Sequence, residues 1–179
     1  MDRRSAALTT GMSVAFLLAV YPGPSARAQT APHDIPQAVR LDHEETLRQL
    51  TTIARRHTRT GDIARKALPV FKAHFQREEE YILPPLTLAP ALADGRVNPD
   101  MRWAIAMADR IKAESIAIFE EHTVITEWMT ELAAAAERRH ERDVVDFARA
   151  AVADSLYDTE VTEPTAIVIG EYLRARLGP

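Results

Sequence analysis

The chain has 179 residues, enough for one domain with a sizeable apolar core. Its 26 acidic and 22 basic residues give a formal net charge of −4, so the composition offers no large basic surface for nucleic acid. Cysteine is absent, which excludes disulfides, thiolate metal sites and cysteine nucleophiles. Proline and glycine are sparse, and helix-forming Ala, Glu, Arg and Leu dominate the middle, so an all-α fold is predicted.

The beginning of the chain has the pattern of a secretory signal peptide. A charged start at residues 2–4 precedes an apolar run over 6–21, and residues 26–28 (Ala-Arg-Ala) form a cleavage signal. We therefore expect residues 1–28 to be removed, leaving a secreted or periplasmic domain over 29–179 with no membrane association. The alternative is an uncleaved anchor, for which the apolar run is short.

Two helices are predicted next. Apolar residues recur at helical spacing over residues 36–57, and the segment 58–61 (Thr-Arg-Thr-Gly) ends this first helix. A second helix is expected over 62–82, with Pro69 bending it or marking a local break. The consecutive prolines at 84–85 end it.

Residues 86–99 are predicted to form a long connection. The third helix begins at Asp100, and apolar residues then alternate at spacings of three and four as far as Ala136. The charged segment 137–143 is predicted to be a tight turn, because folding back there buries both apolar faces. One unbroken helix over 100–163 is the alternative.

A fourth helix is expected over residues 141–163, and Pro164 kinks or ends it. Residues 165–177 then form a short helical extension. The predicted fold is therefore an all-α, up-down-up-down antiparallel four-helix bundle with a short C-terminal helical extension.

The most informative stretch is His74-Phe-Gln-Arg-Glu78, with a fainter copy eighty residues later, Asp154-Ser-Leu-Tyr-Asp158. Residues four apart lie on one face of a helix, and both pairs fall on apolar stripes. A carboxylate that faces a helical core is costly unless a positive charge lies against it. Two such arrangements predict a shared positive object inside the bundle, most simply a metal ion.

Helical geometry predicts that these residues meet. Two residues of an antiparallel pair lie at the same height when the turn is midway between them. The midpoint of His43 and His74 falls at the first turn, and that of His122 and Asp154 falls in the charged turn. The expected metal ligands are therefore His43, His74, Glu78, His122, Asp154 and Asp158.

Imidazole nitrogen with carboxylate oxygen and no thiolate is a donor set used by iron, manganese and zinc. Glu78 and Asp158, one from each half, are placed to bridge two ions. The donor set itself leaves iron, manganese and zinc open, as two ions or as one.

These motifs resemble the hemerythrin-like (HHE) domain family. The resemblance runs from Ile35 to Leu173. It rests on Asp42-His43-Glu44, the segment His74 to Pro84, Glu121-His122, and Glu160-Val-Thr-Glu-Pro164 with the residues that follow. It implies a four-helix bundle with a non-haem di-iron centre that binds dioxygen or related small oxidants.

The fourth element departs from the family pattern of a second His-x-x-x-Glu. Asp154 stands where the family has histidine, and Asp158 stands where it has glutamate. Because aspartate is shorter than either residue, the resemblance here implies altered coordination of one ion. More carboxylate and less imidazole also favours an oxidised metal over reversible dioxygen carriage.

The favoured function is binding or sensing of dioxygen, nitric oxide or peroxide by an exported iron protein, and no substrate pocket is predicted. The second hypothesis is a carboxylate-rich di-metal oxidase or peroxidase. The third is a metal-free bundle in which the histidines are hydrogen-bonded core residues and the site has decayed. For Asp154 and Asp158 a further alternative exists, because another stripe of helix four can face inward; its members are Val145, Ala148, Val152 and Leu156.

Overall fold

The computed structural model of the protein describes residues 33–178, which are helical apart from short connections and contain no β-strand. The predicted all-α class is therefore confirmed. None of the helices in this range is both long enough and apolar enough to span a bilayer. The signal peptide predicted over residues 1–28 lies outside the described residues.

The first two helices form a hairpin. Helix α1 covers Gln37–Ala54, and α2 covers Arg59–Arg77. The Thr58 hydroxyl accepts a hydrogen bond from the Gly61 backbone N–H and so caps α2. The helix therefore begins at Arg59, three residues before the predicted start. Helix α2 continues through Pro69, so the proline does not break it.

Short helical pieces form the end of the predicted second helix and most of the segment predicted as a long connection. A π turn, η1, covers Glu78–Ile82, and a 3₁₀ helix, η2, follows at Pro84–Leu88. One turn of α-helix, α3, covers Ala89–Ala93, and a second 3₁₀ turn, η3, covers Pro99–Arg102. Both 3₁₀ helices begin at proline, which lacks an N–H and is tolerated in a first turn.

The tight turn predicted in the charged segment is confirmed, and the single long helix is wrong. Helix α4 covers Trp103–Glu137 and α5 covers Arg142–Tyr157. His140, in the connection, has a φ of 59°, a left-handed conformation that an α-helix cannot contain. The chain reverses here, and α5 packs along α4.

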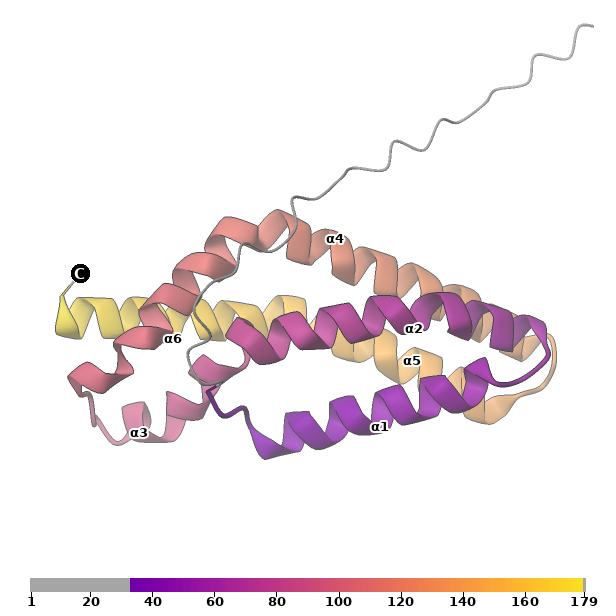
Figure 1. Ribbon diagram of the computed structural model, residues 1–179, viewed down its shortest axis with the longest axis horizontal. Coiled ribbons are helices and arrows are strands. Elements are labelled where there is room, and N and C mark those ends of the chain that lie inside the picture. The colour runs from indigo at the N-terminus through magenta and orange to yellow at the C-terminus, as the bar shows by residue number, and fades with distance from the viewer. Residues whose placement is uncertain (1–32, 179) are drawn as a thin grey trace, which may run out of the picture. The chain divides into compact units, whose positions relative to one another are not determined.

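A second π turn, η4, covers Asp158–Thr162 and leads directly into α6, Glu163–Leu177. Figure 1 shows α6 continuing from α5 along the long direction of the helical region, residues 33–178. Pro164 therefore does not end the fourth helix. It lies in the first turn of α6.

The two π turns lie eighty residues apart, and each is followed at the same distance by a proline. In each turn the last hydrogen bond spans five residues, from the Leu83 N–H to the Glu78 carbonyl and from the Glu163 N–H to the Asp158 carbonyl. A proline ring clashes with the carbonyl four residues before it. We attribute both wide turns to this clash, because widening the helix moves that carbonyl aside.

The core divides into three apolar clusters along the unit. The largest is built from α1, α2, α4 and α5, and it includes Leu50, Phe71, Ile125 and Phe147. A second gathers around Tyr81 and Ile118, and a third lies between η3, α4 and α6. Helix α1 packs mainly on α2 and only lightly on α5 (Figure 1).

Helices α4 and α6 pack closely because of one glycine. A Cβ placed on Gly170 would lie 2.2 Å from the Cβ of Ala108, far inside van der Waals contact. This approach holds the first turn of α6, and with it Glu163, against α4.

We expect Gly170→Leu to lower the free energy of unfolding by about 1–3 kcal/mol, because the added side chain overpacks the contact with Ala108. Val168→Leu is the matched control, since Val168 is 64% exposed on the same helix and its change should stay within about 0.5 kcal/mol. Urea unfolding of both variants measures the difference. Equal stabilities would contradict close packing at Gly170.

Candidate metal centre

Three buried side chains converge in the space between the first and second apolar clusters. His74 comes from the last turn of α2, Glu78 from the start of η1 and His122 from the middle of α4. One ligand atom from each of the three lies within 4.8 Å of the others. The ring centroids of His74 and His122 are 4.5 Å apart.

His43 brings α1 to the same carboxylate. Its Nε2 atom lies 3.3 Å from Oε2 of Glu78, while Nε2 of His74 lies 3.4 Å from Oε1. Glu78 is 1% exposed and stands between the two imidazoles. Neither carboxylate oxygen has a hydrogen-bond partner, and each lies at ion-pair distance from one imidazole. A buried carboxylate without hydrogen bonds fits a site that a cation completes.

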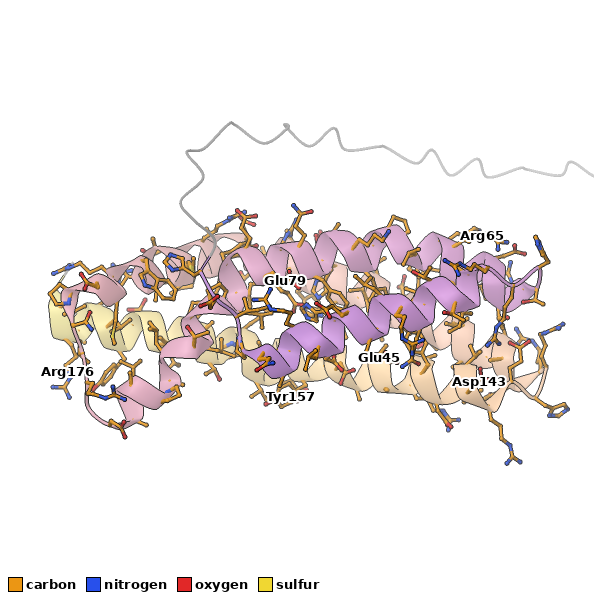
Figure 2. All side chains as sticks on the ribbon, turned by 60° about the horizontal axis from the view of Figure 1, so that its bottom comes forward. Glu45, Arg65, Glu79, Asp143, Tyr157 and Arg176 are labelled. Atoms are coloured by element: carbon orange, nitrogen blue, oxygen red, sulfur yellow. The ribbon has the colours of Figure 1, made fainter. Side chains whose placement is uncertain are left out.

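Each of the three histidines is also held from outside through Nδ1. That atom lies 3.0 Å from Oε1 of Glu79 in His43, 3.4 Å from Oε2 of Glu121 in His74, and 2.9 Å from Oγ of Ser155 in His122. Figure 2 shows Glu79 beside the N-terminal part of α1. Such outer partners fix the ring orientation and leave Nε2 facing inward, the arrangement common among metal-binding histidines.

Glu163 is a residue that the sequence analysis missed. It lies in the first turn of α6, is buried, and its Oε1 atom is 2.7 Å from Nε2 of His122. The sequence contained a signal for it, an acidic residue directly before Pro164 at a helix start. The spacing of the second-helix motif, carried over to the fourth helix, predicts Asp154 and Asp158 instead.

The fourth-helix aspartates occupy different places. Asp158 is half-buried, and burial together with the negative charge of Glu78 raises its pKa to about 6. Asp154 departs from the expectation of an inward ligand, because its side chain is exposed and does not join the buried group. Burial and the charge of Asp42 raise the pKa of Asp154.

Ser155 takes the inward position that Asp154 was expected to fill. The buried stripe of α5 runs through Val144, Ala148 and Ala151 and reaches Ser155, which is four residues further on. A step of three residues would have reached Asp154. Of the alternative stripe, Val145 and Val152 are half-buried and Leu156 is exposed, whereas Ala148 is buried and belongs to the inner face as well.

Charges in the group are strongly coupled. Burial opposes protonation of His74, but Glu121 and Glu78 outweigh it and raise the pKa to about 9. Burial likewise disfavours the Glu78 anion, but His43 and His74 outweigh it and lower the pKa to about 2. The pKa of His43 is raised by Glu78 and Glu79 against the effect of burial.

A cavity of about 540 Å³ adjoins this group, although no substrate pocket was predicted. His43 and His74 form part of its wall, and Asp154, Ser155 and Asp158 border it from α5 and η4. The space exists because α1 touches α5 only lightly.

No family model matches the chain, and no curated protein or solved structure matches it either. The chemistry of this site is therefore argued from its own geometry. Nitrogen and oxygen donors from three or four helices, with a carboxylate shared between two imidazoles, suit a divalent or trivalent transition-metal ion.

The coupled charges predict that the metal-free protein loses stability as the pH rises. The contribution of His74 is complete below its ordinary pKa of 6.5 and is lost as the pH rises through about 9. Asp158 acts in the same direction, since its raised pKa gives a contribution that is lost between pH 3.8 and about 6. Glu78 sets the acid limit, because its contribution is present above pH 4.5 and lost as the pH falls through about 2.

Thermal unfolding of EDTA-treated protein between about pH 5 and pH 9 measures this slope. We expect the free energy of unfolding to fall by about 3 kcal/mol through His74 and by about 1 kcal/mol through Asp158. His74→Leu should flatten the alkaline part of the curve. A midpoint that increases towards pH 9 would contradict the coupling.

Proposed function

We propose that this chain is an exported hemerythrin-like protein that binds non-haem iron at His74, Glu78 and His122. In this proposal α1, α2, α4 and α5 form the up-down-up-down bundle, with α6 as its extension. The predicted leader supports an extracytoplasmic location. The observation that carries the metal assignment is the Glu78 carboxylate, which is buried between two imidazoles with neither oxygen hydrogen-bonded.

The lone pairs of the site support a cation. When Nδ1 of His43 and His74 donates to Glu79 and Glu121, each Nε2 atom is left with a lone pair facing the Glu78 carboxylate. Acceptors that face one another repel unless a proton or a metal ion lies between them. A proton satisfies only one such contact, whereas a metal ion accepts several donors at once.

The donors support two ions. His74, His122 and one oxygen of Glu78 would hold the first, with Glu163 beside it. His43 and the other oxygen of Glu78 would hold the second, and Asp158 lies close enough to Glu78, His74 and His122 for their charges to interact. The set contains only nitrogen and oxygen, so metal analysis must separate iron from manganese and zinc.

The bound iron would supply electrons and an open position to dioxygen, nitric oxide or peroxide. The residues of the chain orient the ligands. Phe75 stacks on the His43 ring at 3.8 Å, which fixes its plane. Glu121 in turn is held by Arg77 at 2.9 Å, so the outer contact of His74 is itself anchored.

A carboxylate-rich oxidase is the second candidate, and the cavity beside His43 and His74 favours it. A diatomic ligand needs a volume of roughly 30 Å³, about that of a water molecule. The space present is many times larger, so an organic substrate has room next to the metal. The third candidate, a metal-free bundle, predicts no metal uptake at all.

Anaerobic loading with ferrous iron, followed by metal analysis and exposure to air, tests the proposal. We expect two bound ions and an optical charge-transfer band from an oxo-bridged ferric pair. A band that reverses on removing oxygen supports binding or sensing, and turnover with an added reductant supports the oxidase. No iron uptake would refute the proposal and leave the metal-free bundle.

We expect His74→Ala and His122→Ala each to weaken metal binding by at least about 100-fold, because each removes a donor from the buried group. His57→Ala is the matched control, since His57 is exposed at the first turn and should leave the affinity unchanged. A competition titration with a chromophoric chelator measures all three. Equal affinities in the variants and the control would place the metal elsewhere.

A further inference from the structure

The cavity beside the histidines has a shape and lining of its own. Its volume of about 540 Å³ falls in the range of small-molecule pockets. It lies between α1 and α5, and the imidazoles of His43 and His74 are at its inner wall. The lining is mostly apolar and includes Val39, Phe71, Phe75, Leu83, Leu86 and Ile125. A molecule that fills it would bury an apolar body.

Two exposed carboxylates, those of Asp42 and Asp154, stand at the rim of the cavity. Asp42 projects from α1 and Asp154 from α5, and the two carboxylates are close enough for their charges to interact. Tyr157, 60% exposed, also borders the cavity, and Figure 2 shows it near the N-terminal end of α1. No arginine or lysine among residues 33–178 forms an ion pair with Asp42 or Asp154. Their negative charge is therefore not balanced by the described part of the protein.

The inner wall does not supply the missing positive charge. His43 and His74 are each matched by nearby glutamates, namely Glu78 and Glu79 for the first and Glu78 and Glu121 for the second. Asp158 adds a third carboxylate to the lining. The cavity as a whole therefore combines apolar walls with an excess of negative charge.

We propose that this cavity binds a small organic molecule with an apolar body and one ammonium group. The ammonium group lies between Asp42 and Asp154 at the rim, where it remains partly hydrated and neutralises both carboxylates. The apolar body extends inward along Phe71 and Phe75, and its far end reaches His43 and His74. Neutral and anionic molecules of the same shape lack the rim interaction. This binding does not depend on a metal ion.

Alkylammonium ions are suitable probes. Isothermal titration calorimetry of the full chain, both as purified and after EDTA treatment, measures the binding of butyl-, hexyl- and octylammonium chloride. We expect each added methylene to tighten binding by about fourfold. Octylammonium should bind at least about tenfold more tightly than octanol or octanoate, since only the cation pairs with the rim. Equal affinities for octylammonium and octanol, or no measurable binding of octylammonium, would overturn the proposal.

Substitutions locate the site. The double variant Asp42→Asn/Asp154→Asn should reduce octylammonium affinity to that of octanol. Asp146→Asn is the matched control, because it removes an exposed carboxylate from the same helix outside the cavity and should have no effect. An equal loss in the control would show non-specific charge attraction and overturn the proposal.

Filling the cavity tests the apolar part separately. Val39→Trp and Thr46→Phe each place a large ring in the space, and both should abolish octylammonium binding while thermal unfolding remains cooperative. Binding that survives in either folded variant would overturn the assignment to this cavity. Because the EDTA-treated protein is titrated as well, failure of the iron proposal leaves this result interpretable, and the reverse also holds.

Discussion

The buried carboxylate of Glu78 is the constraint on which the rest of this structure depends. Moving a carboxylate out of water costs several kcal/mol unless positive charge and hydrogen bonds replace the solvent. Here Nε2 atoms lie on both sides of it, from His43 on α1 and His74 on α2. The apolar core is divided at this level, because packing alone cannot stabilise an anion. Apolar helix–helix contacts on both sides of the site therefore keep the candidate ligand side chains at the same level.

The two π turns widen the helix next to the buried polar residues, so that the chain stays helical through this level of the core. Each follows its motif, and each is followed at the same distance by a proline, so the two halves repeat in their backbone as well as in their sequence. The side chains that face inward have nevertheless diverged. The first half presents His74 and Glu78, whereas the second presents Ser155 and Glu163 around the single His122 of α4. In the second half, Ser155 and Glu163 contact His122 and orient its ring. In the first half, His74 and Glu78 are themselves candidate metal ligands.

The cavity and the histidine group share a wall, which links the two proposals physically. Helix α1 packs on α2, and His43 on α1 pairs with Glu78. On its other side, α1 contacts α5 only lightly. A molecule in that space would have its charged end at the acidic rim and its apolar end against the imidazoles. Phe71 and Phe75 line the same cavity as these imidazoles.

The amino-acid sequence by itself determined the helical class, the turn between α4 and α5, and the presence of histidines on inward faces. These features depend on local periodicity and on the midpoint rule for antiparallel helices. The sequence alone therefore predicts that His43, His74, Glu78 and His122 lie together. Only the tertiary structure decided that Ser155 rather than Asp154 faces inward, because steps of three and four residues are equally helical and packing chooses between them. It also decided the role of Glu163, since the π turn before it shifts the phase of the helix. The cavity belongs to the tertiary structure as well, because the distance between α1 and α5 is set by contacts that no stretch of either helix encodes alone.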